Sequence, residues 1–512
     1  MTLNYRPYLP AIVSGAVLIF AFPFFDFSLL AFVALVPFLV SLWQMSGRQA
    51  FKAGMAMGVV YFYGTLYWIY YSVYHYGGVP LVAALAVVLL LVLYLSLFTG
   101  LFALLFAKKL RSSSLPALFL APVFWVVLEY ARTYLLSGFP WASIGYTQHE
   151  SLRVIQMADI TGVYGVSFFV VAVNGAIADL FIIRKRREAM PLFHLYPTVV
   201  SYVLLAGLAA AVLLYGGWRL SEERPGKELE ASIVQGNIRQ DLKWNERYQN
   251  RVLDTYETLS ETAELQDDPD LVIWPESALP FYFGLDKERT AAFRRYVSSL
   301  GTPLLTGAVT VKGASSSYEL GNSAVLLTPK GEVAYSYDKI HLVPFGEYVP
   351  LRRVLFFVDK LAHGIGEYVP GEQYTLGKLP GDGEFSTLIC YEIIFPGLVR
   401  KFFKDGEGDF MVTISNDAWF GKTPGPYQHF SMAVFRAVEN RKPVIRATNT
   451  GVSGFIDSNG RVLERTGIFE RNVLTAAVRT DRTVSFYSRF GDLFAYLLIL
   501  GTAILLMDIR RK

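Results

Sequence analysis

Residues 53–107 contain no Asp, Glu, Lys or Arg over 55 consecutive positions. A helix that crosses a bilayer needs about 20 mostly apolar residues, because only helices and closed barrels satisfy their backbone hydrogen bonds in hydrocarbon. The stretch is interrupted at residues 75–80 by the sequence His-Tyr-Gly-Gly-Val-Pro, whose glycines and proline predict a turn. We therefore expect a helical hairpin that crosses a membrane.

Similar apolar runs fill most of the first 218 residues. This part holds 12 Lys/Arg and 6 Asp/Glu, whereas the remaining 294 residues hold 35 and 37. The second part thus has the charge content of a water-soluble domain, about 24%, and the first only about 8%. We expect eight spans, near residues 7–25, 27–45, 53–74, 79–107, 115–136, 160–183, 196–218 and 491–509.

The positions of Lys and Arg predict how these spans are oriented. Clusters at residues 48–52, 108–111, 184–187 and 510–512 all fall on one side of the membrane when the N-terminus is cytoplasmic. This alternation disfavours the interpretation that the apolar runs are core helices of a large soluble protein. We expect a seven-helix transmembrane domain (1–218), an extracytoplasmic domain (219–490), and a C-terminal transmembrane helix with a cytoplasmic tail (491–512).

Short β-type runs alternate with helical stretches between residues 219 and 490, which predicts an α/β fold of layered sheets with helices outside. The sequence lacks a P-loop, a GxGxxG after a strand, and HExxH or CxxC motifs, so we expect no cofactor and no metal. The short cationic clusters indicate no basic face for nucleic acid. We expect strands at 230–235, 270–274, 303–310, 322–328, 332–337, 385–391, 409–415, 443–449, 451–457 and 473–479, and helices at 244–265, 286–300, 394–404 and 427–441.

The chain has a single cysteine, Cys390, at the end of an apolar strand run. A nucleophilic thiol needs a base to remove its proton and a cation to stabilise the oxyanion. Glu276 and Lys339 follow two other strand runs and offer these groups. Taken alone, Cys390 could be an ordinary buried core residue, and Glu276 and Lys339 could be solvated surface charges. The three together favour a catalytic site. His341 and His429 carry no spacing that indicates a Cys–His dyad.

Three motifs carry a resemblance to a known superfamily. Trp274-Pro275-Glu276-Ser277, Lys339 ahead of the segment 341–350, and Ile389-Cys390-Tyr391-Glu392 resemble the Glu–Lys–Cys triad of carbon–nitrogen hydrolases (nitrilases). The longer motifs at 415–421 (SNDAWFG) and 428–440 resemble those of the apolipoprotein N-acyltransferase family. Residues 441–443 read Arg-Lys-Pro where we expect Gly-Arg-Pro, outside the triad. The resemblance covers the whole chain and implies a multi-pass α-helical membrane domain with an extracytoplasmic nitrilase-like αββα sandwich.

The resemblance also implies a reaction with a covalent intermediate. An acyl chain passes from a phospholipid, usually phosphatidylethanolamine, to a cysteine as a thioester. It then passes to the amino group of the diacylglyceryl-modified N-terminal cysteine of an apolipoprotein. The family further implies a bacterial inner membrane, a periplasmic catalytic domain and cytoplasmic termini, and we expect a monomer. Carried over by motif position, the catalytic residues are Glu276 (base), Lys339 (oxyanion) and Cys390 (nucleophile), and the supporting residues are Glu347 and Glu392. Apart from this carry-over, the candidate substrate contacts are Trp244, Tyr391, Asn416 and Trp419.

Two other interpretations remain open from the residues alone. A membrane-tethered amidase acting on a small extracytoplasmic amide would use the same triad, although a tether needs only one span. A transporter or sensor with an inactive external domain is disfavoured by the intact triad and by the lack of paired charges within the spans. We expect apolar segments at 139–141, 280–283 and 355–358 to line a lipid entrance, with 351–372 as a lid. Asp179 is expected at the membrane interface.

Overall fold

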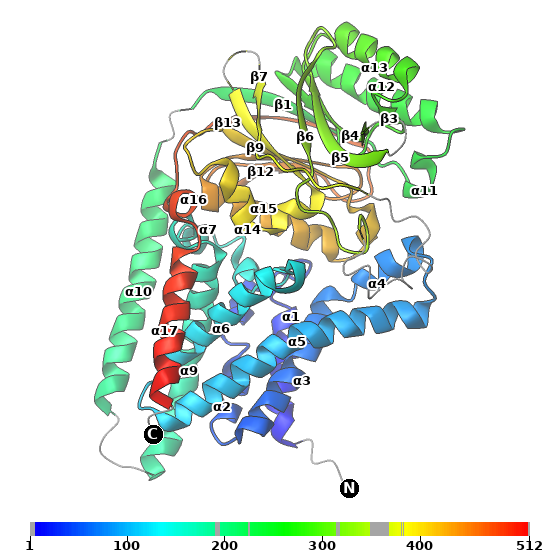
Figure 1. Ribbon diagram of the computed structural model, residues 1–512. Helices are drawn as coiled ribbons and strands as arrows, with labels where there is room; N and C mark the ends of the chain where they lie inside the picture. The colour runs from blue at the N-terminus through cyan, green and yellow to red at the C-terminus, as the bar shows by residue number, and fades with distance from the viewer. Residues whose placement is uncertain are drawn as a thin grey trace. The chain divides into compact units, whose positions relative to one another are not determined.

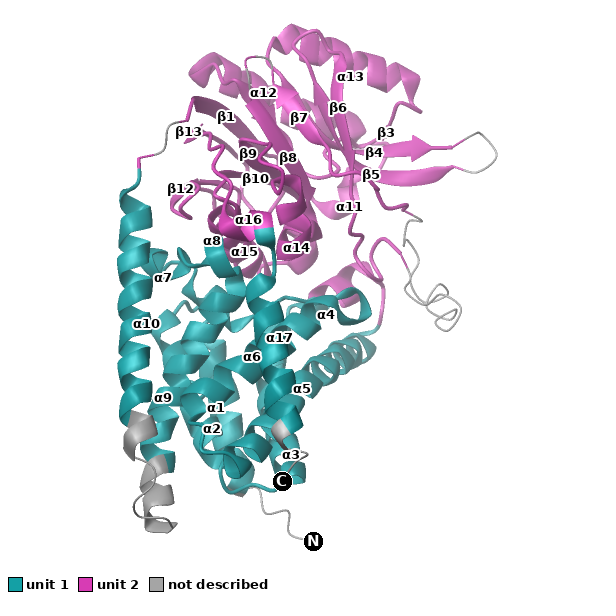
Figure 2. Cartoon of the chain, turned by 60° about the vertical axis from the view of Figure 1, so that its left-hand side comes forward, with its two compact units in different colours: residues 1–70, 80–222, 490–512 teal, residues 71–79, 223–489 magenta. Residues whose placement is uncertain are grey.

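The computed structural model describes residues 6–189, 195–223, 226–313, 318–348, 368–379, 381 and 383–509. These form two compact units, shown in different colours in Figure 2. Unit 1 comprises residues 1–70, 80–222 and 490–512, and unit 2 comprises residues 71–79 and 223–489. The expected turn of the charge-free hairpin therefore groups with unit 2 and not with the helices that flank it in the chain.

Unit 1 is built from helices (Figure 1). Most of its long helices consist of apolar residues, and α3 starts with a capping box in which Ser46 and Gln49 exchange hydrogen bonds. The helices of more than five residues are α1 (Leu9–Ile19), α2 (Val36–Leu42), α3 (Gly47–Leu66), α5 (Leu81–Ser112), α6 (Ala117–Tyr134), α9 (Val163–Ala189), α10 (Leu195–Ser221) and α17 (Leu493–Ile509). Short helices α4 (Ile69–Tyr71), α7 (Leu152–Ile155) and α8 (Ala158–Thr161) complete the set.

The predicted count of eight spans is not confirmed. Among the described residues, four helical segments are long and apolar enough to cross a membrane: 81–112, 117–137, 163–182 and 199–221. Shorter apolar helices occupy 9–19, 28–42 and 493–507. The first expected span ends early because the chain turns after Ile19, with positive φ at Phe24 and Asp26. The second is broken at Val33, between a 3-10 turn (Ser28–Phe32) and α2.

Asp179, which was expected at the membrane interface, is buried within unit 1. Its side chain is 3% exposed, and its two carboxylate oxygens accept hydrogen bonds from the backbone N–H groups of Ala117 (2.8 Å) and Leu118 (3.0 Å). These are the first residues of α6, whose N–H groups have no partner within the helix. Asp179 on α9 therefore caps α6, where a negative charge is also favoured by the helix dipole.

Two charged residues of α6 hold the segment that follows it. Glu129 accepts from the backbone N–H of Ile144 (2.8 Å), and Arg132 donates to the carbonyl oxygen of Trp141 (2.8 Å). Trp141 is 1% exposed, and its ring centroid lies 5.0 Å from that of Trp68. The expected lipid-lining role of 139–141 is therefore not supported, because Trp141 packs within unit 1.

Unit 2 contains two sheets with helices on their outer faces (Figure 1), which confirms the predicted layers. The first sheet has the order β13-β1-β2-β4-β5-β6, with β3 beside β4, and the second has the order β12-β11-β10-β9-β8-β7. The strands of the first sheet are β1 (Glu228–Gln235), β2 (Leu271–Ile273), β3 (Tyr282–Phe283), β4 (Leu304–Lys312), β5 (Glu319–Leu327), β6 (Val333–Asp338) and β13 (Asn472–Arg479). Those of the second are β7 (Leu376–Leu379), β8 (Gly383–Ile389), β9 (Phe410–Ser415), β10 (Val444–Thr448), β11 (Gly454–Ile456) and β12 (Val462–Arg465).

The ten strands expected from the sequence are all present, and β3, β7 and β12 were not anticipated. The expected helix at 394–404 is instead a short helix followed by a 3-10 turn. The helices of unit 2 are α11 (Gln240–Lys243), α12 (Gln249–Asp267), α13 (Lys287–Leu300), α14 (Pro396–Val399), α15 (Gly425–Asn440) and α16 (Phe486–Phe490), the last ending in unit 1.

Parallel pairing brings several strand ends to the same edge of each sheet. In the first sheet β1, β2 and β4 run parallel, and in the second β8, β9 and β10 run parallel. A core of α12, α13 and the first sheet is centred on the fully buried Trp274, just after β2. This arrangement places the segments that follow β2 and β8 where side chains can meet.

Candidate active site

Cys390 lies at a sharp turn between β8 and a 3-10 turn, η6 (Cys390–Ile394). Its φ is +52°, a left-handed conformation that costs a non-glycine residue about 1–3 kcal/mol and is typical of functional sites. Burial and the carboxylate of Glu276 raise the pKa of its thiol above the usual range, while Lys339 and a hydrogen bond to Ser415 lower it. The resting side chain is therefore a protonated thiol, which needs a base to become a nucleophile.

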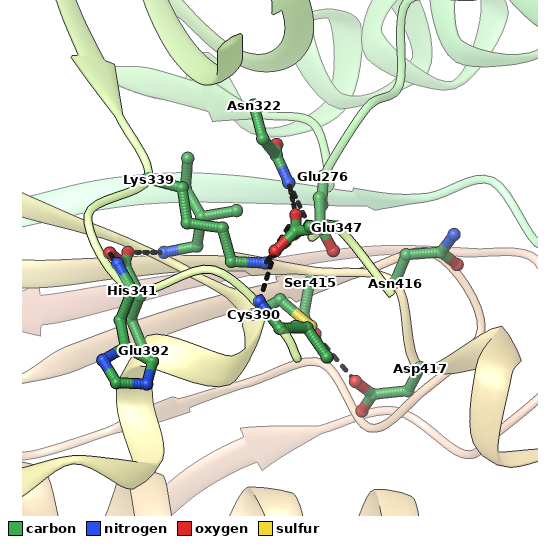
Figure 3. A network of polar contacts seen from close by, with 12 residues as sticks. Glu276, Asn322, Lys339, His341, Glu347, Cys390, Glu392, Ser415, Asn416 and Asp417 are labelled. Carbon is green, nitrogen blue, oxygen red and sulfur yellow. Dashed lines mark hydrogen bonds and ion pairs between the residues drawn. The ribbon is translucent and has the colours of Figure 1, made fainter. Parts of the chain in front are cut away.

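One buried ammonium joins two carboxylates beside this thiol (Figure 3). The Nζ of Lys339 lies 3.0 Å from Glu347 and 3.6 Å from Glu276, and the lysine is 1% exposed. Although burial lowers its pKa, the charges of Glu347 and Glu276 raise the pKa of Lys339 well above its usual range. A fixed positive charge of this kind can stabilise an oxyanion.

Asn322 on β5 connects the same two carboxylates, and we did not anticipate it. Its Nδ2 donates to Glu276 Oε1 (2.8 Å) and to Glu347 Oε1 (2.7 Å). The amide and the ammonium thus both contact the same oxygen of Glu276, Oε1. A polar residue within the buried part of a strand was the signal that could have identified Asn322.

The backbone beside Glu276 is held in a strained turn. Ser277 has a φ of +47°, and the Nζ of the fully buried Lys243 donates to the carbonyl oxygen of Glu276 (2.9 Å). Burial lowers the pKa of Lys243 to about 8. A Cβ on Gly307 of β4 would lie 2.4 Å from the Ser277 nitrogen, so only glycine allows this turn to approach the strand.

Glu392 connects the turn after Cys390 to the segment that carries Lys339. It accepts from the hydroxyl of Tyr337 (2.8 Å) and from the backbone N–H groups of Ile340 (2.7 Å), His341 (3.1 Å) and Ile389 (2.7 Å). Burial raises its pKa to about 7, against the lowering effect of these hydrogen bonds. Glu392 therefore holds the backbone next to the lysine, whereas Glu347 contacts the ammonium itself.

A second polar cluster lies next to the backbone of Cys390 and was not predicted as part of the site. His429 of α15 places its Nε2 3.2 Å from the carbonyl oxygen of Cys390 and its Nδ1 3.0 Å from Asp417. Arg446 of β10 contacts both partners, at 3.0 Å from Asp417 and 2.9 Å from His429 Nδ1. His429 thus reaches the backbone of the cysteine, which is not the ring-to-sulfur contact of a Cys–His dyad.

Two of the expected substrate contacts are partly exposed aromatic residues. Trp244 is 36% exposed, and its ring lies 5.5 Å from that of Tyr282. Trp419 is 38% exposed and contacts the segment 71–79 of the same unit, where the ring of Tyr76 lies 4.8 Å away. Both present apolar surface to solvent, as a lipid-binding residue would.

The other two expected contacts are buried. Asn416 donates to Gln240 Oε1 (2.7 Å) and accepts from Asn449 (3.2 Å), so its amide is engaged within the protein. Tyr391 packs with its ring 5.1 Å from that of Phe395. Figure 3 shows Asn416 near Cys390 and Asp417.

Most of the expected lid lies outside the described residues, because 349–367 is not among them. Of its glycines, Gly371 donates its N–H to Lys339 O (2.8 Å), and a Cβ there would lie 2.2 Å from the Asp338 oxygen. Gly371 is therefore needed for close packing beside the lysine.

The expected lipid-lining segment 280–283 is divided between core and surface. Phe281 is 3% exposed within the core, and Tyr282 is 40% exposed.

Within the described part of the chain, no group of three or more His, Cys, Asp or Glu could hold a metal ion.

Two family models match the chain. Residues 14–176 match the apolipoprotein N-acyltransferase N-terminal domain, and residues 230–487 match the carbon–nitrogen hydrolase domain. The chain is 41% identical over 508 residues to an apolipoprotein N-acyltransferase from Geobacter metallireducens, which covers 99% of this chain and 96% of the relative. It is 33% identical over 516 residues to one from Pasteurella multocida, which covers 98% of this chain and 94% of the relative.

Solved structures of the nitrilase superfamily are also similar to part of the chain. An amidase from Nesterenkonia sp. is 21% identical, covers 53% of this chain and 97% of its own, and has a TM-score of 0.39. A carbon–nitrogen hydrolase superfamily protein from Xanthomonas campestris is 21% identical, covers 54% of this chain and 97% of its own, and has a TM-score of 0.38.

Proposed function

The chain belongs to the apolipoprotein N-acyltransferase family, and from that premise we propose how its residues N-acylate lipoproteins. It is a membrane-embedded N-acyltransferase, and the amidase alternative is not supported. Its substrates are a lipid and a lipoprotein. We propose that the donor is phosphatidylethanolamine and that the acceptor is the amino group of a diacylglyceryl-modified N-terminal cysteine.

The first half-reaction loads the enzyme with an acyl chain. Glu276 takes the proton of the Cys390 thiol, and the thiolate adds to the ester carbonyl carbon of the phospholipid. A C–S bond forms while the carbonyl π electrons move to the oxygen, which Lys339 and the backbone N–H after Cys390 stabilise. When the intermediate collapses, the ester C–O bond breaks and Glu276 returns its proton to the departing lysophospholipid oxygen.

The second half-reaction transfers the chain to nitrogen. The neutral amine of the acceptor attacks the thioester carbon while Glu276 takes a proton from the nitrogen. A C–N bond forms, the C–S bond breaks, and the thiolate takes the proton from Glu276. The same three side chains therefore serve both halves, with the base acting as an acid in the reverse direction.

One observation carries this assignment. The only cysteine ends a strand beside a buried ammonium that lies 3.0 Å from one carboxylate and 3.6 Å from another. The two carboxylates allow separate roles, since Glu347 pairs with Lys339 at hydrogen-bonding distance. Glu276 lies farther from the ammonium and is the better candidate for exchanging a proton with the thiol.

The function is tested by following the acceptor. Full-length protein in phosphatidylethanolamine vesicles is incubated with a synthetic diacylglyceryl-cysteine peptide, and the lipopeptide is analysed by mass spectrometry. We expect the peptide mass to rise by one acyl chain, and no rise with Cys390→Ser. Vesicles of phosphatidylglycerol with identical chains test the choice of donor head group. An unchanged peptide together with hydrolysis of small amides would contradict the proposal.

We further propose that the protein is a monomer of the bacterial inner membrane with unit 2 on the periplasmic side and both termini in the cytoplasm. Because Cys390→Ser leaves no cysteine, single cysteines can report sidedness. The side chain of Lys378 is 76% exposed, and Arg48 is exposed at the start of α3. In spheroplasts, an impermeant maleimide should label Lys378→Cys but not Arg48→Cys, and the opposite pattern would contradict this orientation.

A further inference from the structure

The carbonyl oxygen of Cys390 faces a fully buried charged cluster that takes no part in the proposed proton transfers. His429, Asp417 and Arg446 are each 0% exposed and come from α15, from the start of the 3-10 turn η8 (Asp417–Phe420), and from β10. Burying a charged cluster is costly unless its members are paired. We therefore ask what the contact between this cluster and the carbonyl oxygen of Cys390 contributes to the site.

The contacts determine which nitrogen of His429 carries hydrogen. The carbonyl oxygen of Cys390, 3.2 Å from Nε2, can only accept, so Nε2 must be the donor. Arg446 Nη2 has two hydrogens, and its two acceptors here are Asp417 Oδ2 (3.0 Å) and His429 Nδ1 (2.9 Å). The opposite tautomer could donate from Nδ1 to Asp417 Oδ1 (3.0 Å), but it would set two lone pairs against each other at Cys390 and two hydrogens against each other at Arg446. With the hydrogen on Nε2, Nδ1 accepts from Arg446 and lies beside Asp417 Oδ1 without donating to it.

The charges in the cluster agree with a neutral imidazole. Burial and the guanidinium of Arg446 lower the pKa of His429 below its usual value. Although burial raises it, the guanidinium of Arg446 holds the pKa of Asp417 well below its usual range, so that the Asp417–Arg446 pair stays ionised. Asp417 is held in turn by the hydroxyl of Ser415 (2.7 Å).

The peptide between Cys390 and Tyr391 links this cluster to the reaction. In a trans peptide the C=O and the following N–H lie in one plane and point in opposite directions. A hydrogen bond to the oxygen therefore fixes where the N–H points, and it also polarises the amide so that the N–H becomes a stronger donor. At Cys390 the left-handed φ of +52° makes such an external restraint necessary.

We propose that His429 is a positioning residue that orients the Cys390–Tyr391 peptide, so that the N–H of Tyr391 points at the oxyanion formed during acylation. This inference rests on the proposed function, in which Cys390 is acylated. His429 touches neither substrate nor thiol in this role. Arg446, which donates to Nδ1, keeps the ring in the tautomer that donates to Cys390.

A matched pair of amide variants tests the proposal. His429→Gln can place an N–H donor near the position of Nε2, whereas His429→Asn reaches only as far as Nδ1, and both keep a polar group against Asp417 and Arg446. Single-turnover acylation by phosphatidylethanolamine is measured for both. Ser431→Ala, which removes a side-chain hydrogen bond from the same helix, is the control.

We expect His429→Asn to slow acylation about 10- to 100-fold, less than the 10²–10³ lost with a whole oxyanion donor. His429→Gln should stay within about fivefold of the wild type, since it restores the bond to the carbonyl, and KM for the phospholipid should not change in either variant. Alkylation of Cys390 by iodoacetamide builds no oxyanion, so its rate should be similar in all variants.

Equal acylation rates for His429→Asn and the wild type would overturn the proposal, as would equal losses in the Asn and Gln variants. A parallel loss of alkylation would also overturn it, because it would mean that the thiol itself had moved. A wild-type enzyme that is not acylated would instead refute the proposed function, and the two failures can therefore be told apart.

Discussion

Replacing Asn322 by leucine should separate catalysis from stability. The substitution keeps the branching at Cγ and removes the amide that donates to Glu276 at 2.8 Å and to Glu347 at 2.7 Å. A hydrogen bond to a charged group contributes about 1.5–3 kcal/mol. Losing the bond that fixes Glu276 should therefore slow acylation about 10- to 100-fold, at 1.4 kcal/mol for each factor of ten.

The effect of this substitution on folding should be smaller than two lost hydrogen bonds suggest. The Oδ1 of Asn322 is buried without a hydrogen-bond partner, a penalty of about 1–3 kcal/mol that leucine relieves. We expect the free energy of unfolding to change by less than about 2 kcal/mol. The amide is thus better explained by its place between the carboxylates than by stability.

The assay is single-turnover acylation of Cys390 together with thermal unfolding in detergent. Ser323→Ala is the matched control, because adjacent strand residues face opposite sides and Ser323 contacts Asp338 (2.6 Å), not the carboxylates. Asn322→Leu acylating within about twofold of the wild type would refute the reasoning. So would a rate loss accompanied by an equal loss in Ser323→Ala.

Three further predictions follow from single contacts. Gly307→Ala places a Cβ 2.6 Å from the Cα of Glu276 and should slow acylation at least about tenfold, whereas Gly383→Ala, whose nearest atom is 3.4 Å away, should not. Asp179→Asn should lower the stability of unit 1 by about 1 kcal/mol through its cap on α6, measured by the unfolding midpoint, and leave acylation at low temperature unchanged. Acylation should fall as pH drops through about 7, because protonation of Glu392 removes an acceptor of backbone N–H groups, and Glu392→Gln should abolish this dependence. Folding raises the pKa of Glu392 from 4.5 to about 7, so between these pH values unfolding releases a proton. The free energy of unfolding of the wild type should therefore decrease as the pH rises from 4.5 to about 7, and this decrease should be absent in Glu392→Gln.

Ten of the strands that the structure describes, and the catalytic residues at their ends, were predictable from local sequence. The apolar run 271–273 leads through Trp274 and Pro275 to Glu276, and the strand 383–389 ends directly before Cys390. Asn322 and Arg446 lie inside strands, and their partners are determined by strand pairing and by side chains distant in the chain. No local pattern indicates such contacts.

In unit 1, too, local sequence does not predict contacts between residues that are distant in the chain. Mean hydropathy identifies the long helices, such as 81–112, but does not reveal that the chain breaks at Val33, where neither Gly nor Pro occurs. The capping role of Asp179 was not anticipated, because its distance along the chain from a cationic cluster says nothing of α6, whose first N–H groups donate hydrogen bonds to it. Its partners are determined by the tertiary packing of α9 and α6.

The acyl-enzyme is the most direct test of the proposed chemistry. Protein purified with phosphatidylethanolamine and no acceptor is analysed by intact mass and peptide mapping. We predict an added acyl chain on Cys390 that hydroxylamine removes, that the lipopeptide acceptor discharges, and that is absent in Cys390→Ser and blocked in Glu276→Gln. Lipopeptide acylation in the absence of any adduct on Cys390, with the same activity in Cys390→Ser, would contradict it.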